Sequence, residues 1–360
     1  MLWLAGLMGI MSVGAFAFAD PQSAADEDEE FAEPSLTPET TGPLPAADAS
    51  DLETAFIPED PFVADYDPRG GDDAAILPAY VLSEGDQVTL TEGEETDDVL
   101  EGTDGNDRIR GLEGDDALTG RAGNDELRGE EGDDTLGGDA GSDTLHGHDG
   151  DDDMRGGSED DALFGHNSDD TLYGDDGNDA LQGSAGHDSL DGGTGDDTLQ
   201  GGLDDDTLTG GMGADALFGG WGSDVLNGIM RDVGGKDIDS GDFLNGGGGD
   251  DSILAGAGDI ITGGDGADQI VLGEWIGDGA AAQIMDFMVD DDSLVLVWDD
   301  SEADSVEPTI SLSIDSDTPA HTLVFMDGTM VAMVNGTDLI ADDIALISLS
   351  AATQAGLAVN

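Results

Sequence analysis

Aspartate recurs every nine residues through the middle of the chain. From residue 102 to residue 227 the sequence divides into fourteen consecutive nonapeptides, each with Gly at position 1 and Asp at position 6. A typical unit, 192–200, is Gly-Gly-Thr-Gly-Asp-Asp-Thr-Leu-Gln. Position 8 is Leu except for Ile109 and Met154. Carboxylates repeated in this way suit hard cations, which prefer oxygen ligands.

The period also predicts the elements that hold these carboxylates. Self-similarity at a short, fixed period is typical of a solenoid. The first six residues of each unit are rich in Gly and Asp and predict a turn. The last three predict one short strand, with position 8 pointing inward and positions 7 and 9 outward. Two units then make one coil, so each turn stacks on the turn 18 residues away.

Stacked turns bring their position-6 carboxylates close together. Successive coils of a parallel solenoid lie about 4.8 Å apart, and carboxylates at that spacing repel unless a cation lies between them. Ca²⁺ accepts six to eight oxygens in tolerant geometry, and glycines at positive φ can turn their carbonyls toward it. Mg²⁺ is the poorer candidate because it requires octahedral geometry. The spacing therefore predicts Ca²⁺ between the turns.

The array continues beyond its regular part. A degenerate unit, 93–101, precedes it in the same register. The stretch 228–245 is irregular but two units long, and 255–262 is one residue short of a unit. These irregularities leave the sites at Asp242 and Asp259 undecided. The last good unit ends at residue 271.

The nonapeptides resemble the RTX (repeats-in-toxin) family over residues 93–271, about half of the chain. The resemblance implies an all-β fold, a parallel β-roll with a row of Ca²⁺ along each edge, bound by the position-6 Asp and by turn carbonyls. The carboxylates that it implies are Asp107, Asp116, Asp125, Asp134, Asp143, Asp152, Asp161, Asp170, Asp179, Asp188, Asp197, Asp206, Asp215, Asp224, Asp251 and Asp268. The glycines that represent the turns are Gly102, Gly105, Gly120, Gly123, Gly192, Gly195, Gly210 and Gly213.

Three units depart from the family pattern at position 4. Glu159, Ser168 and Asp204 stand where Gly is expected. These turns are predicted to bind Ca²⁺ weakly or through a side chain. We expect on the order of ten bound ions rather than a full set.

Charge limits the partners and couples folding to cations. The 360 residues include 85 acidic and 8 basic ones, a net charge of −77, which excludes nucleic acid as a partner. Within 93–271 there are 48 acidic and 7 basic residues. Self-repulsion should expand this region when no cation is present, so the sequence predicts a roll that folds on binding Ca²⁺. The absence of Cys excludes disulfides and thiolate sites.

Flanking segments differ from the roll, which we place at 81–271. Residues 1–19 are apolar and predict either a signal peptide or a membrane anchor, the one expected membrane contact. Residues 20–80 are acidic and hold nine of the eleven prolines, which predicts a disordered linker. Residues 272–360 predict a β-rich cap for the open end of the solenoid. The strand-like segments in this region are 284–287, 293–298, 309–314, 322–326 and 329–334.

The resemblance also implies a compartment. RTX proteins are typically exported unfolded through type I secretion machinery, guided by an uncleaved C-terminal signal, and fold outside the cell. Residues 344–360 are uncharged and rich in small residues, which fits such a signal or, equally, a last strand with a frayed tail. A second, N-terminal signal would be redundant.

Motifs of the enzymes that often carry such repeats are missing: the chain has neither H-E-x-x-H nor G-x-S-x-G. We therefore predict a secreted, non-enzymatic calcium-binding protein. Two alternatives stay open. One is a cell-surface adhesin or surface-layer stalk, with an unknown surface partner. The other is a hydrolase with an unrecognised site in 272–360.

Histidines and aromatic residues of the array are two further groups of candidate site residues. For the histidines, exposed turn positions are favoured over a transition-metal site. These are His146, His148, His166 and His187. Four scattered aromatic residues could form a glycan or partner surface, although scattered aromatics more often have no such role. They are Phe164, Tyr173, Phe218 and Trp221.

Overall fold

The computed structural model describes residues 88–355 and 357, with gaps at 234, 240, 278–279 and 302–304. The predicted signal or anchor segment (1–19) and acidic linker (20–80) lie outside the described residues. Within them, nearly all regular structure is β-strand, and the one α-helix is α1 (Leu349–Ala355). None of the described helices is long and apolar enough to cross a membrane.

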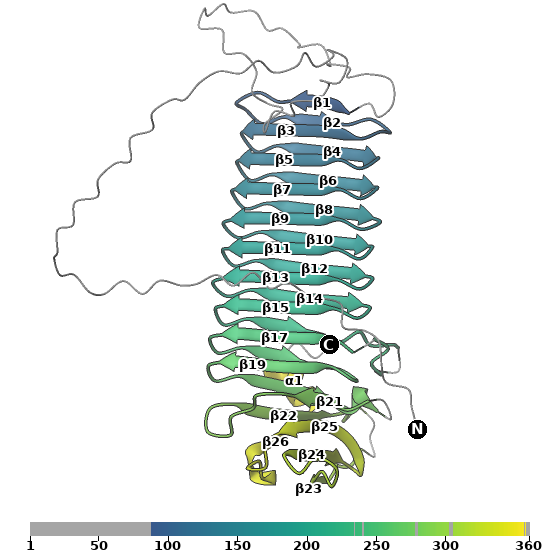
Figure 1. Cartoon of the computed structure of the whole chain (residues 1–360), viewed down its shortest axis with the longest axis vertical. Coiled ribbons are helices and arrows are strands. Elements are labelled where there is room, and N and C mark those ends of the chain that lie inside the picture. The colour runs from purple at the N-terminus through teal and green to yellow at the C-terminus, as the bar shows by residue number, and fades with distance from the viewer. Residues whose placement is uncertain are drawn as a thin grey trace, which may run out of the picture. The chain divides into compact units, whose positions relative to one another are not determined.

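The strands form two sheets that alternate along the chain (Figure 1). Strands of the first sheet, in spatial order, are β1 (Thr89–Glu92), β3 (Asp107–Glu113), β5 (Glu126–Glu131), β7 (Thr144–Asp149), β9 (Ala162–Asn167), β11 (Ala180–Ala185), β13 (Thr198–Leu203), β15 (Ala216–Trp221), β17 (Phe243–Gly248), β19 (Ile260–Asp265), β21 (Ala282–Ile284), β25 (Thr329–Asn335), β24 (His321–Met326) and β23 (Ile310–Ile314).

The second sheet is built from the strands between them. In spatial order these are β2 (Val99–Glu101), β4 (Ala117–Ala122), β6 (Thr135–Ala140), β8 (Asp153–Ser158), β10 (Thr171–Asp176), β12 (Ser189–Thr194), β14 (Thr207–Met212), β16 (Val225–Asn227), β18 (Ser252–Leu254), β20 (Gln269–Gly273), β22 (Ser293–Trp298) and β26 (Ile344–Ser348).

Register confirms that two units make one coil. Leu172 of β10 pairs with Leu190 of β12 in parallel, and Leu181 of β11 pairs with Leu199 of β13, each 18 residues further on. The fold is thus the parallel β-roll that the period predicts. Its coils stack along one direction, with the two sheets facing each other across the core (Figure 1).

The prediction of three-residue strands was wrong, because most strands are longer. Most strands hold six residues: positions 7 to 9 of one unit and 1 to 3 of the next, as in β10 and β12. The turn therefore shrinks to positions 4 to 6. Position 1 continues the alternation, pointing inward like position 8, and both are buried. His146, His148 and His166 consequently lie on strands, and the prediction of turn positions holds only for His187.

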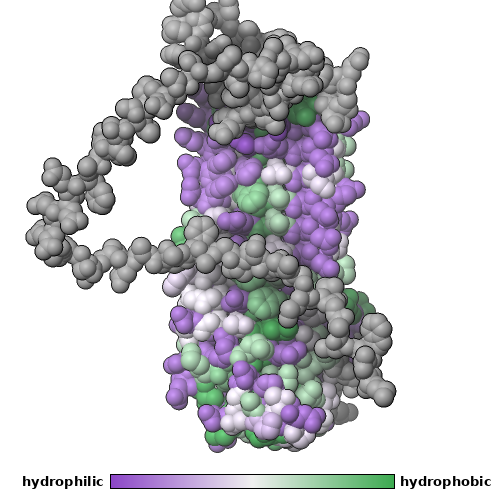
Figure 2. All heavy atoms as spheres, in the orientation of Figure 1, coloured by the Kyte–Doolittle hydropathy of each residue, from purple (hydrophilic) through white to green (hydrophobic). Residues whose placement is uncertain are grey.

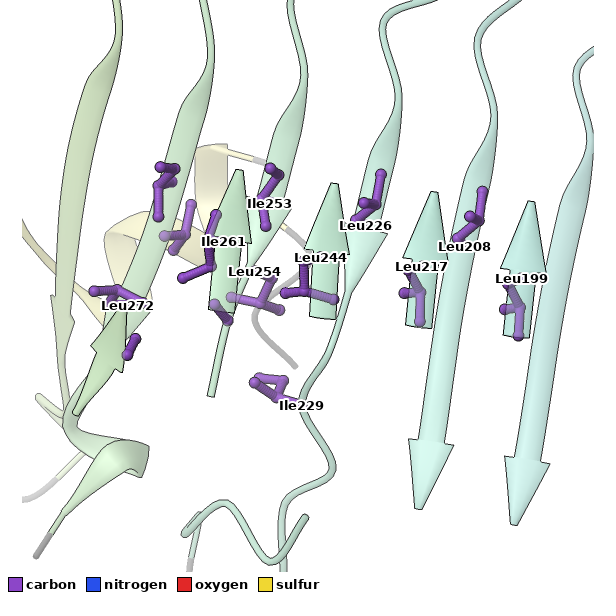
Figure 3. Close-up of a cluster of buried hydrophobic side chains, with 14 of the residues drawn as sticks. Leu199, Leu208, Leu217, Leu226, Ile229, Leu244, Ile253, Leu254, Ile261 and Leu272 are labelled. Atoms are coloured by element: carbon purple, nitrogen blue, oxygen red, sulfur yellow. The ribbon is translucent and has the colours of Figure 1, made fainter. Parts of the chain in front are cut away.

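Position-8 side chains fill the space between the sheets. From Ile109 to Leu226 each is at most 2% exposed. Figure 3 shows Leu199 and Leu217 of the first sheet beside Leu208 and Leu226 of the second, each row pointing toward the other. Burying such a side chain contributes about 1.5–3 kcal/mol. One pair of leucines per coil is a thin core, so the fold depends on its edges as well.

The irregular stretches keep the register of the roll. Strand β15 pairs with β17 at an offset of 27 residues, as in Leu217 with Leu244, so nine residues loop out of this coil. Strand β17 then pairs with β19 at an offset of 17, which absorbs the shortened unit. The sheets therefore pass through both irregularities without a slip.

The C-terminal region continues the roll before it closes it. In the second sheet, β22 and β26 extend the parallel ladder beyond β20. In the first sheet, β25 pairs in parallel with β21, and β24 and β23 then add in antiparallel fashion. The strands predicted at 293–298, 309–314, 322–326 and 329–334 agree with β22 to β25 within one residue at each end. The strand predicted at 284–287 lies later than β21.

Polar side chains cover most of the surface along the repeats, and apolar ones are scattered among them (Figure 2). Toward the C-terminal end the same face becomes more mixed. This distribution matches an inward row of Leu and outward polar positions.

Candidate metal centre

Two rows of buried carboxylates run along the edges of the roll, one at each junction of turn and strand. Every position-6 Asp in them is at most 4% exposed. One row leads into the second sheet: Asp116, Asp134, Asp152, Asp170, Asp188, Asp206, Asp224, Asp251 and Asp268. The other leads into the first sheet: Asp107, Asp125, Asp143, Asp161, Asp179, Asp197, Asp215, Asp242 and Asp259. All sixteen carboxylates implied by the sequence lie in these rows.

Each carboxylate except that of Asp107, the first in its row, is oriented by the coil before it. The backbone N–H of Asp161 donates to Oδ1 of Asp179 over 2.8 Å, and that of Asp170 donates to Oδ1 of Asp188 over 2.9 Å. The same bond repeats down both rows, with an offset of 18 residues in the regular coils. In all the row members that accept this bond, one oxygen is fixed, and the direction of the other is set.

The second oxygen, Oδ2, is the unusual atom. In sixteen of the eighteen aspartates that make up the two rows, it is buried and has no hydrogen-bond partner among the described residues. The exceptions are Asp107, whose Oδ2 accepts from the Thr103 N–H at 2.5 Å, and Asp259, whose Oδ2 accepts from the Gly256 N–H at 2.5 Å. A buried carboxylate oxygen without a partner is costly, and its repetition in turn after turn indicates a row of cation sites.

Burial also makes the carboxylates of the two rows weaker acids. Burial raises the pKa of Asp152 to about 7, that of Asp170 to about 8 and that of Asp242 to about 9. The backbone hydrogen bond opposes the rise, and neighbouring carboxylates add to it. The protein alone therefore disfavours the ionised form of these carboxylates, and a cation beside them would stabilise that form.

Glycine at position 1 makes room for the carboxylate. A Cβ on Gly192 would lie 2.5 Å from Oδ2 of Asp197 and 2.5 Å from the carbonyl oxygen of Gly210 in the next coil. A Cβ on Gly102 would likewise lie 2.7 Å from Oδ2 of Asp107. Carboxylate and carbonyl oxygens thus face the same cradle, and Gly120 repeats the arrangement around Asp125. This oxygen-only donor set fits Ca²⁺.

Position 4 carries the positive φ of the turn. Gly123, Gly195 and Gly213 have φ of 119°, 134° and 148°, whereas Gly105, in the first coil, does not adopt positive φ. The position-1 glycines do not adopt it either, so their role is space rather than backbone conformation.

The three units without Gly at position 4 keep the same turn. Glu159, Ser168 and Asp204 have φ between 74° and 82°. The carboxylates of these units stay buried in the rows, with Oδ2 unpartnered. The residues that replace Gly at position 4 therefore strain the backbone of the turn, but they do not move the carboxylates out of the rows.

Comparison with known proteins gives the same assignment. The family model of the RTX calcium-binding nonapeptide repeat matches residues 92–127, 128–163, 155–190, 164–199, 191–226, 239–270 and 258–274. The chain is an RTX repeat protein. Its repeats are calcium-binding repeats, which agrees with the oxygen cradle described above.

The chain is also similar to solved structures. One similar solved structure is the solution structure of the AlgE6R3 subunit from the Azotobacter vinelandii mannuronan C5-epimerase, at 20% sequence identity, covering 53% of this chain and 80% of that one, with a TM-score of 0.15. No curated protein matches the chain.

A second ladder in the RTX units was not anticipated from the sequence. Position-5 side chains accept hydrogen bonds from the position-5 N–H of the next coil, as Asp169 does from His187 at 2.8 Å and Asp205 from Ser223 at 2.7 Å. These side chains are exposed, and their bonds run opposite in sense to those of the carboxylate rows. Asn178 shows that a neutral amide serves as well, since its Oδ1 accepts from the Asp196 N–H.

The sequence left the sites at Asp242 and Asp259 undecided and did not assign Asp292 to a row. Asp242 and Asp259 join the rows with the usual bonds, and the Asp268 N–H donates to Oδ1 of Asp292, which extends one row into the C-terminal region. The sequence signal that could have identified them is an apolar residue two positions after the Asp, as Leu244 follows Asp242. The insertion also brings a third carboxylate, Asp239, whose oxygen lies within 4.8 Å of oxygens of Asp215 and Asp242.

Proposed function

We propose that this RTX protein holds Ca²⁺ between its stacked turns through Oδ2 of the position-6 aspartates together with turn carbonyls, and that the roll folds as the ions bind. The observation that carries the proposal is the repeated Oδ2 atom, which in sixteen turns is buried and has no partner in the described part of the chain. Ca²⁺ would supply the positive charge that these oxygens lack and would neutralise the repulsion along each row.

Coupling of binding to folding follows from the charge balance. The region 93–271 has a net charge of −41, while its core consists mainly of one pair of leucines per coil. Folding without cations would bury a row of carboxylates at each edge, at a cost of a few kcal/mol for each ionised group. Metal binding energy then becomes folding energy.

We further propose that the protein acts outside the cell and without catalysis, as a calcium-dependent structural element. A fold that needs many Ca²⁺ ions suits a compartment rich in calcium, and the RTX resemblance favours export in an unfolded state through type I machinery. Failure of a variant lacking residues 344–360 to leave the cell would support this route, and its normal secretion would contradict it.

Far-UV circular dichroism of the full-length protein during a Ca²⁺ titration tests the central proposal. The expected result is a cooperative change from coil to β-structure, with no such change in Mg²⁺ at equal concentration. Equal β-structure in excess chelator would show that the leucines suffice and would overturn the folding switch. Equilibrium dialysis then counts the ions, which we expect to number on the order of ten.

A further inference from the structure

Three imidazoles gather on the outer face of the first sheet. His146 and His148 are two residues apart on β7, and His166 of β9 pairs with His148 in the register. Phe164 pairs with His146, so the four side chains form one patch on β7 and β9. These two strands are neighbours in the first sheet (Figure 1). The rings of His148 and His166 stack with centroids 4.6 Å apart and planes 2° apart. Phe164 stacks on His146 at 4.8 Å.

The ring nitrogens converge on one point. His146 Nδ1 lies 3.1 Å from His166 Nε2, and one nitrogen from each of the three rings lies within 4.8 Å of the other two. Nε2 of His148 is buried and has no hydrogen-bond partner among the described residues. Two nitrogens bound to one zinc ion at about 2.0–2.1 Å lie roughly 3 Å apart, so the 3.1 Å separation already suits a shared ion.

Neutral imidazole, the form that binds metals, is favoured here. Burial, together with the neighbouring His166 and His148, lowers the pKa of His146 to about 4. Burial also lowers the pKa of His166. Arg128 on β5, which pairs with His146 in the register, forms an ion pair with Glu126 at 2.6 Å, which offsets its repulsion of a metal.

We propose that His146, His148 and His166 bind one divalent transition-metal ion, such as Zn²⁺, on the outer face of the roll. The site is chemically separate from the carboxylate rows, because Ca²⁺ takes oxygen ligands whereas imidazole suits Zn²⁺, Ni²⁺ and Cu²⁺. The ion replaces the hydrogen bond between His146 and His166 and takes up the unpartnered nitrogen of His148. It links β7 to β9 and so fastens two successive coils of the first sheet.

Isothermal titration of Zn²⁺ into the full-length protein tests the site, with Ca²⁺ held in large excess to occupy the carboxylates. We expect one site of micromolar or higher affinity. His166→Gln should weaken it at least about tenfold, and His187→Gln, the matched change in an exposed turn of the same array, should leave it unchanged. Equal loss in both variants, or wild-type binding no tighter than that of His166→Gln, would overturn the proposal.

A second measurement does not depend on how the variants fold. Cu²⁺ added to the calcium-loaded wild-type protein should give an electron paramagnetic resonance spectrum with nitrogen hyperfine splitting from imidazole ligands. A spectrum of oxygen coordination alone would rule the site out. Because both experiments report on imidazoles, their failure would leave the calcium proposal standing, and failure of the calcium-folding experiment would not decide this one.

Discussion

The backbone N–H of Asp152 donates to Oδ1 of Asp170 over 2.9 Å, across one full coil of 18 residues. This bond fixes the carboxylate of Asp170 while its Oδ2 stays buried without a partner. One oxygen therefore stabilises the fold, and the other is the atom that we propose to bind Ca²⁺. The two roles separate in experiments that keep the shape of the side chain and remove its charge.

Asp170→Asn should have opposite effects with and without calcium. The amide keeps an oxygen for the Asp152 N–H but loses the charge that Ca²⁺ needs, so the Ca²⁺ midpoint of folding should rise. In chelator the same change removes a buried carboxylate, and the chain should fold at a lower concentration of a stabilising osmolyte. Circular dichroism measures both transitions.

Asp169→Asn is the control for this change. Asp169 is the adjacent, exposed position-5 residue, and Asn178 shows that an amide can replace it in its ladder. Neither transition should move by more than about 0.5 kcal/mol. If Asp169→Asn and Asp170→Asn behave alike, the ions are not held by the buried row.

Acidification should favour the roll when calcium is absent. Burial raises the pKa of Asp143 to about 6 and that of Asp170 to about 8, above the ordinary value of 3.8. Between pH 4 and pH 9 the folded state then binds more protons than the unfolded chain, so its stability falls as pH rises.

Calcium-free protein followed by circular dichroism from pH 8.5 down to pH 5 checks this sign. β-structure should increase as the pH falls and should be lost again on return to pH 8.5. In saturating Ca²⁺ the trend should reverse, because protons compete with the metal for the same carboxylates. A calcium-free signal that is independent of pH would contradict the burial of ionisable rows.

Leu199→Ala should destabilise the calcium-loaded roll by about 2–5 kcal/mol, because it leaves a cavity between the sheets. Leu203→Ala provides the matched control: Leu203 is on the same strand, β13, but is 51% exposed, and its loss should cost less than about 1 kcal/mol. Urea unfolding at fixed, saturating Ca²⁺ measures both. Equal costs would mean that the inward row does not form the core.

Ser184→Gly should stabilise the roll by about 1 kcal/mol. Ser184 stands at position 2 of its unit with φ of 97°, a conformation that glycine adopts without strain. Ser189→Gly, at an exposed position of β12 where φ is not positive, should instead destabilise by about 0.5–1 kcal/mol. Thermal unfolding in saturating Ca²⁺ compares them. Destabilisation by both would show that position 2 is not strained.

Much of the roll could be predicted because a single short period repeats through it. The two sheets, the inward row of Leu and both rows of Asp follow from this spacing alone. Strand length could not, because the inward role of the position-1 Gly depends on the carboxylate folded beside it, as with Gly192 and Asp197. The histidine patch was missed for the same reason. Assigning position 2 to a turn placed His148 and His166 off the sheet that brings them together.

Alternation between two sheets also limits how such an array can lengthen or shorten. Duplicating a single nonapeptide would exchange the sheets of every later strand, and the C-terminal region, where β25, β24 and β23 extend one sheet and β26 the other, would meet the wrong partner on each side. Only pairs of units preserve the match. The 27-residue coil between Leu217 and Leu244 obeys this parity: its surplus nine residues are looped out rather than wound in.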